Sequence, residues 1–203
     1  MDNSFKDIVL MLPDSILFGS FFLGLITISQ QHLLLFASLL EGLFLLKGFQ
    51  SIATFMNGSQ KLNPDKCKSK FQGLTFSNLS EFFHSDSISY GVYLFTLASS
   101  YFVNSRVALK DELEVLDSSY LIQTNVIMYI LLGLSLTYAI VKVVLECDSL
   151  TSVSLALILG LIMGIFLVYQ NIHLFNKNTI NFMGIPLLRN KTANNQPIYI
   201  CSQ

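Results

Sequence analysis

The chain has 203 residues, of which 52% are hydrophobic and only 12% are charged, about half the charged share of an ordinary soluble domain. The apolar residues stand in long uncharged blocks, which is typical of membrane-spanning helices and argues against a soluble protein. A net charge of −1 provides no basic field for neutralising phosphates, so nucleic-acid binding is not expected.

The first apolar block covers residues 16–49 and is interrupted by Gln30, Gln31 and His32. At a rise of about 1.5 Å per residue, the block is too long for one upright helix across a hydrocarbon core of about 30 Å, while each half is short for a complete span. The block is therefore either one long bent helix or a helical hairpin that turns at residues 29–32. We favour the hairpin or a sharp bend.

Three further spans are predicted. Residues 88–103 form a short block rich in tyrosine and phenylalanine, whose aromatic side chains we expect at the membrane interface. Residues 126–144 and 150–169 each have the length that a bilayer requires, and a turn at 146–149 makes them an antiparallel pair. The sequence thus predicts an all-α integral membrane protein. Residues 1–170 form a bundle of four transmembrane helices with short polar loops, or five if the first block is a hairpin.

Three polar segments lie outside these spans. Residues 56–87 form a loop with a lysine cluster that would contact anionic lipid headgroups or a partner, or would only keep the loop soluble. The cluster consists of Lys61, Lys66, Lys68 and Lys70. Residues 105–123 predict an amphipathic helix with an acidic side. Residues 171–203 form a small extramembrane tail, for which a β-hairpin is one arrangement.

Small residues recur at helical spacing within the predicted spans. Helices in lipid gain little from hydrophobic association, so close packing depends on small side chains that let backbones approach each other. We therefore predict helix-packing faces in three places. Their residues are Ser20, Gly24 and Thr27 in the first block, Gly133 and Thr137 in the next-to-last span, and Ser152, Ala156, Gly160 and Gly164 in the last.

Glu41 is the one carboxylate in the middle of an apolar run, and Lys142 is a second charge near the end of a span. An ionisable residue inside a membrane suggests a function by default. Because Ala37 and Ser38 lie one turn before Glu41, we expect the carboxylate on a small-residue face, where it would hold a helix interface. Lys142 has Glu146 four residues further on as a local partner. A contact between Glu41 and Lys142 is a further possibility.

Catalytic arrangements are not evident. The chain has no GxSxG, HExxH or glycine-rich phosphate loop, and its three cysteines lie far apart without a CxxC pair. The sequence therefore supports no claim of a zinc site or a disulfide framework, and it predicts no cofactor and no enzymatic activity. The preferred hypothesis is a structural membrane protein. The alternatives are a small channel or carrier in which Glu41 and Lys142 line a polar path, and, with least support, a membrane enzyme acting on lipids.

The least generic stretch is PDKCKSKFQGLTFSNLSEFF, residues 64–83. Together with KDELEVLDSSY at 110–120, ECDSL at 146–150 and NFMGIPLLRNKTANNQPIYIC at 181–201, it resembles small multi-span membrane proteins of large icosahedral DNA viruses of algae and protists. These viruses carry a bilayer beneath the capsid. The resemblance covers most of the chain from about residue 14. It implies a structural component of the host-derived inner virion membrane that contacts capsid or other virion membrane proteins. Self-association of the chain is a further possibility.

Overall fold

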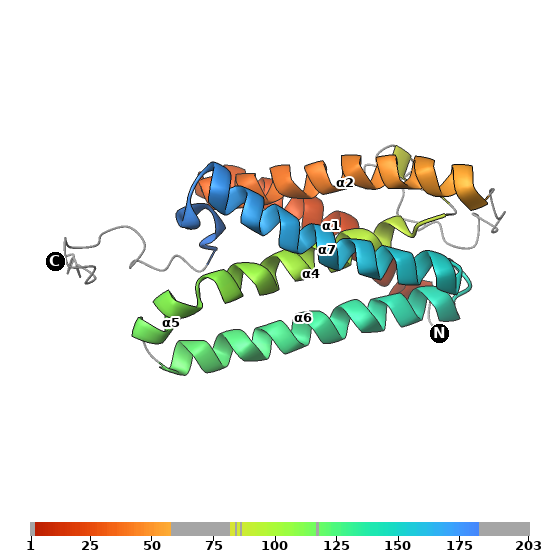
Figure 1. Ribbon diagram of the computed structural model, residues 1–203. Coiled ribbons are helices and arrows are strands. Elements are labelled where there is room, and N and C mark those ends of the chain that lie inside the picture. Colours follow the sequence, from red (N-terminus) through yellow and green to blue (C-terminus); the bar gives the residue numbers. More distant parts are fainter. Residues whose placement is uncertain (1–2, 58–81, 84, 86, 117, 183–203) are drawn as a thin grey trace.

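The described part of the protein is built from helices that run along one common axis (Figure 1). The computed structural model describes residues 3–57, 82, 83, 85, 87–116 and 118–182, and no strand occurs among them. The helices are α1 (Asn3–Thr27), α2 (Gln30–Asn57), α4 (Tyr90–Ala108), α5 (Lys110–Leu116), α6 (Ser118–Val144) and α7 (Leu150–Leu174), followed by the 3-10 helix η2 (Lys177–Ile180).

The first apolar block is divided into two helices that pack antiparallel. Ile28, between α1 and α2, has a φ of 49°, in a left-handed conformation that a helix does not continue through. The rings of Phe21 and Phe36 then lie 4.9 Å apart, and Gly24 packs under Leu33. Residues of rising number on α2 thus meet residues of falling number on α1, which is the helical-hairpin arrangement.

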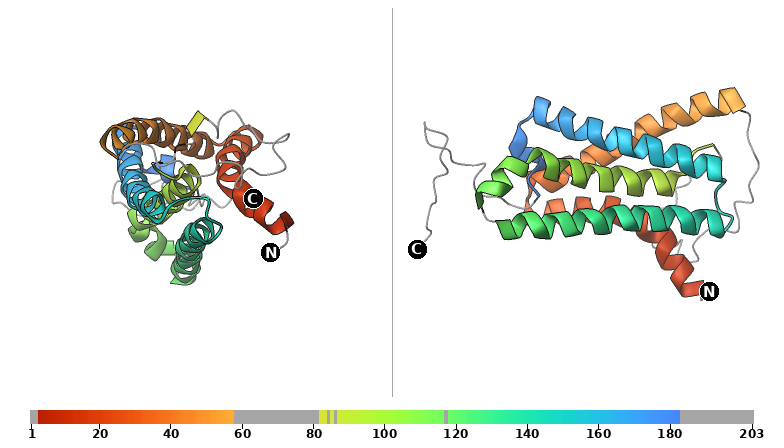
Figure 2. Two further views of the ribbon diagram at one scale, coloured as in Figure 1. Left: turned by 90° about the vertical axis from the view of Figure 1, so that its right-hand side faces the viewer. Right: turned by 60° about the horizontal axis from the view of Figure 1, so that its bottom comes forward.

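Helix α4 occupies the centre of the bundle. Every residue from 88 to 101 is buried, and the end-on view in Figure 2 shows α4 inside a ring formed by the other long helices. Its most extensive contact is with α7, followed by α6 and α1. The aromatic residues of this segment, which we expect at the membrane interface, include Tyr93 and Tyr101, and both are completely buried among neighbouring helices.

Three of the described helices are long and apolar enough to cross a membrane. They contain the candidate spans Gln30–Ala53, Ile122–Val144 and Leu150–Leu174. Helix α1 contributes a shorter apolar segment, Met11–Thr27. Helix α4 is not among the helices that are long and apolar enough to cross a membrane. The described helices therefore support an integral membrane protein.

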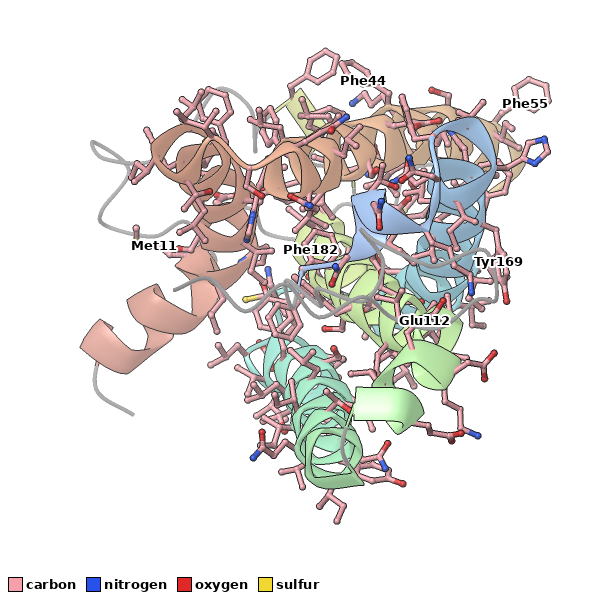
Figure 3. All side chains as sticks on the ribbon, turned by 90° about the vertical axis from the view of Figure 1, so that its left-hand side faces the viewer. Met11, Phe44, Phe55, Glu112, Tyr169 and Phe182 are labelled. Atoms are coloured by element: carbon pink, nitrogen blue, oxygen red, sulfur yellow. The ribbon has the colours of Figure 1, made fainter. Side chains whose placement is uncertain are left out.

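The outer surfaces of these helices are apolar. Ile140 on α6 and Ile158 on α7 are more than half exposed. Viewed from the end of the bundle in Figure 3, Phe44, Phe55 and Tyr169 point away from the helices, whereas Phe182 lies among them. A surface of this kind is suited to lipid rather than to water.

The segment between α4 and α6 differs from the prediction. Residues 105–123 do not form one amphipathic helix but belong to the end of α4, to α5 and to the start of α6. The chain bends at Leu109, which is buried together with Leu113, because their apolar side chains pack inward on the bundle instead of lying on its surface.

The chain after residue 170 also begins inside the bundle. Helix α7 continues to Leu174, and η2 folds back so that Ile180 is buried and the ring of Phe182 contacts those of Tyr101 and Phe102. Residues 171–182, which are predicted from the sequence to lie in the tail, therefore pack on the bundle. The lysine cluster and most of the predicted β-hairpin lie outside the described residues.

Candidate functional site

The contact between α4 and α7 follows one constant register. The backbone N–H of Ser89 donates to the carbonyl oxygen of Ser152 at 3.5 Å, and further along Gly160 packs against Thr96 and Gly164 against Ser100. The sequence separations are 152 − 89 = 63, 160 − 96 = 64 and 164 − 100 = 64. A constant difference means that the two helices run parallel. We call this contact the α4–α7 seam.

The seam requires glycine at two positions. A Cβ atom on Gly164 would lie 2.5 Å from the Oγ atom of Ser100 and 2.9 Å from the carbonyl oxygen of Leu97, and a Cβ atom on Gly160 would lie 3.0 Å from that of Tyr93. Ser152 and Ala156 on the same face are buried. All four residues of the predicted stripe in the last span thus face α4, where the Ser100 hydroxyl also donates to the Leu161 carbonyl at 2.9 Å.

In the first block, two of the three predicted packing residues face a neighbouring helix. Ser20 is buried, and Gly24 lies so close to α2 that a Cβ atom would be 2.7 Å from the Leu33 side chain. Thr27 is exposed and donates to the carbonyl of Leu23 in its own helix. Gly42 on α2, which the sequence interpretation passed over, packs closely against Leu97 of α4.

The predicted packing residues of α6 do not face another described helix of this chain. Gly133 and Thr137 are exposed, and nothing lies within 4 Å of a Cβ atom built on Gly133. The face that contacts α4 instead contains Ser135, whose hydroxyl donates to the Ser99 hydroxyl at 2.8 Å, together with buried Tyr138. Both faces carry a small residue, so spacing alone did not identify the one facing inward.

Glu41 lies at the edge of the contact between α2 and α7. The side-chain amide nitrogen of Gln170 lies 2.8 Å from one carboxylate oxygen of Glu41 and 3.0 Å from the other, and it donates to both. The core-facing side of α2 is the leucine side, which includes fully buried Leu39 and Leu43, while Ala37 is exposed. The expected small-residue face around Glu41 is therefore only partly present.

One turn away, a buried amide connects three helices. The Asn171 nitrogen donates to the Ser38 hydroxyl of α2 at 2.7 Å and to the Tyr101 hydroxyl of α4 at 2.6 Å. Asn171 is only 4% exposed, so these bonds replace contacts with water that the side chain has lost. We refer to Ser38, Glu41, Tyr101, Gln170 and Asn171 as the α2–α4–α7 polar cluster.

Lys142 belongs to a second group at the opposite end of α7. Its Nζ atom lies 3.5 Å from Oδ2 of Asp148, which also accepts a hydrogen bond from the Ser89 hydroxyl at 2.7 Å. The Tyr90 hydroxyl donates to Oδ1 of Asp14 at 2.7 Å. Asp14, Ser89, Tyr90, Lys142 and Asp148 join α1, α4, α6 and the α6–α7 turn, and we call them the turn-end cluster.

The two clusters are far apart. Gln170 lies 20 residues beyond Leu150, the first residue of α7, which corresponds to about 30 Å along the helix. The suggestion that Glu41 contacts Lys142 is therefore wrong, because each charge has its partner at a different end of the bundle. The partner of Lys142 in the structure is Asp148, and not Glu146 as the local spacing suggested.

Several of these partners were not predicted from the sequence. In the sequence prediction the last span ends at residue 169 and the tail begins at residue 171, so Gln170 and Asn171 are given no partners on other helices. The available signal was the four-residue stripe of Ser152, Ala156, Gly160 and Gly164. Extended by two more turns, it comes to Val168 and Ile172, directly beside these amides.

Cys147 in the α6–α7 turn forms a bond on which the sequence supported no claim. It is buried and disulfide-bonded, and the other two cysteines lie outside the described residues. Widely spaced cysteines carry no signal of pairing in the sequence, so this bond was not predicted. Within the described ranges, no three side chains of histidine, cysteine, aspartate or glutamate gather as they would around a metal ion. His32 contacts Ser29 at the α1–α2 turn and His173 is exposed.

No protein-family model, curated protein or solved structure matches the chain.

The α4–α7 seam predicts opposite effects of alanine at two glycines. Gly164→Ala should lower the free energy of unfolding by about 1–3 kcal/mol, because the added methyl group overlaps Ser100. The matched change Gly133→Ala should leave stability unchanged or raise it by about 0.5–1 kcal/mol, since alanine is the better helix former and the site is open. Thermal unfolding of both variants in detergent measures the difference. Equal effects would contradict the seam.

The turn-end cluster predicts which carboxylate is coupled to Lys142. A double-mutant cycle of Lys142→Met with Asp148→Asn should give a coupling energy on the order of 1 kcal/mol, because the two groups are in contact and poorly hydrated. The matched cycle with Glu146→Gln should give a clearly smaller value. Chemical unfolding in detergent provides the four stabilities of each cycle, and a larger coupling to Glu146 would refute the assignment.

Proposed function

We propose that this protein is a structural multi-pass membrane protein whose helical bundle is built for fixed packing. The observation that carries this proposal is that its intramembrane polar groups pair with residues of other segments of the bundle. Both carboxylate oxygens of Glu41 accept bonds from Gln170, and Lys142 pairs with Asp148. Groups that bind and release an ion or proton must be able to exchange partners, whereas these groups connect one helix to another.

We further propose that α1 and α4 lie in the membrane together with the three apolar helices, which gives five helices at bilayer depth. Helix α4 carries polar side chains such as Thr96, Ser99 and Ser100, all of which are buried. Because the surrounding helices separate these side chains from lipid, α4 does not need the hydropathy of an isolated span. The apolar part of α1 would be completed as a span by its pairing with α2.

The proposed location is the inner membrane of a large icosahedral virion. This part rests on the resemblance carried by residues 64–83, 110–120, 146–150 and 181–201. In this arrangement the bundle anchors the protein in the bilayer, and the lysine-bearing loop and the tail contact capsid or scaffold proteins. The apolar outer faces of α6 and α7 would contact lipid or a second copy of the chain.

Crosslinking mass spectrometry on intact native particles tests the proposed location. We expect reproducible crosslinks from Lys61, Lys66, Lys68 and Lys70 to capsid or scaffold proteins, because these lysines lie in the segment proposed to leave the membrane. Crosslinks confined to the chain and its own oligomer would overturn the anchoring role and would favour the carrier hypothesis.

Substitutions of Glu41 and Gly160 separate a structural protein from a channel or carrier. Glu41→Gln should leave ion or proton flux in proteoliposomes at the level of the unmodified protein and should permit assembly, since glutamine still accepts a bond from Gln170. Gly160→Leu should abolish assembly, because its side chain cannot fit beside Tyr93 and Thr96. Protein-dependent flux that disappears in Glu41→Gln would instead establish transport.

A further inference from the structure

A small cavity opens between the end of α4 and the beginning of α6. It has a volume of about 70 Å³ and is lined mainly by apolar side chains, among them Phe102, Ile127, Leu131 and Phe182. Thr124 and Ile127 stand at the start of the candidate span Ile122–Val144, so the cavity lies near the level at which a bilayer changes from headgroups to acyl chains. This location is independent of the two polar clusters described above.

Two buried polar atoms at the cavity, one from Ser105 and one from Arg106, lack hydrogen-bond partners. Ser105 is only 3% exposed, lines the cavity, and its hydroxyl has no hydrogen-bond partner. The Nε atom of Arg106, on the next residue, is also buried and has none. A buried donor without an acceptor destabilises the fold, so both groups point to an acceptor that enters from outside the protein.

Arg106 also has no counter-charge within the described ranges. In the following helix α5, Glu112 pairs instead with Lys177 at 3.2 Å. Lys110 pairs with Glu114 at 3.3 Å on the surface. A guanidinium group at the edge of an apolar cavity is stabilised by an oxyanion that accepts two parallel hydrogen bonds, which is the geometry that phosphate offers.

We propose that this cavity binds an anionic phospholipid. Its phosphate accepts hydrogen bonds from Arg106 and Ser105, and the upper part of one acyl chain lies against Ile127 and Leu131. The apolar walls are the reason to choose a lipid over free phosphate, because an inorganic anion would leave most of the cavity lining without a matching partner. The proposal concerns lipid selectivity and does not depend on the proposed virion location.

A unique tryptophan makes this site measurable, because the chain contains none. Ile127→Trp places the reporter at the cavity, and Ile158→Trp places it on the outer face of α7 as a control for ordinary lipid contact; both positions are about half exposed. The protein is reconstituted in phosphatidylcholine with either brominated phosphatidylglycerol or brominated phosphatidylcholine, and bromine quenching reports which lipid is close. We expect about fivefold preference for the anionic lipid at residue 127 and none at residue 158.

Two substitutions on this background assign the preference to Arg106. Arg106→Gln should remove it, whereas Lys110→Gln, which deletes a nearby cation of the same charge, should retain it. Arg106→Lys should keep part of it, because charge remains but the forked donor geometry is lost. If Arg106→Gln does not fold, the comparison of the two reporters in the otherwise unmodified chain still decides between selective and ordinary lipid contact.

The contrary outcomes are distinct. Equal preference at residues 127 and 158, or loss of preference in Lys110→Gln to the same extent as in Arg106→Gln, would overturn the proposal in favour of a diffuse surface effect. Loss of preference on addition of excess inorganic phosphate would assign the site to a free anion and overturn the lipid assignment. Native mass spectrometry without the tryptophan should agree, with fewer phosphatidylglycerol molecules retained by Arg106→Gln than by Lys110→Gln.

Discussion

The distance between α4 and α7 is the constraint on which the rest of the bundle depends. Gly160 and Gly164 bring the backbone of α7 against α4, close enough for the Ser100 hydroxyl to reach the Leu161 carbonyl. With larger side chains the helices would separate, and α4 would lose the enclosure that keeps its serine, threonine and tyrosine side chains away from lipid. Close approach and burial of polar groups are therefore one property here, since neither persists without the other.

The polar clusters add specificity that apolar packing cannot supply. Leucine side chains pack against lipid tails nearly as well as against each other, so they do not determine which helices pair. Asn171 contacts Ser38 and Tyr101 at one end, and Asp148 contacts Ser89 and Lys142 at the other. Two such points about 30 Å apart fix both the rotation and the sliding of α7 relative to α4.

Local patterns in the sequence predicted the properties that depend on a single helix, but not those that depend on its neighbours in the bundle. The apolar blocks indicated a helical membrane protein, and the stripe from Ser152 to Gly164 indicated the inner face of α7. The burial of residues 88–101 was not foreseeable in this way, because their tyrosines and serines suit a membrane interface equally well. The open surroundings of Gly133 within this chain were unforeseeable for a related reason: a small residue permits close packing but does not require a neighbour. The partners of Glu41 and Lys142 depend on contacts between segments far apart in the chain.

The enclosed position of α4 has a consequence for how the protein is made. Helix α4 leaves the ribosome before α6 and α7, yet these later helices cover it and supply the partners of Ser99 and Ser100. A newly made α4 would enter the bilayer alone only weakly, because transferring its polar side chains into lipid is unfavourable. In the proposed five-helix arrangement, stable insertion of this segment would wait until α6 and α7 have been synthesised, and the bundle would close around its central helix from the C-terminal side.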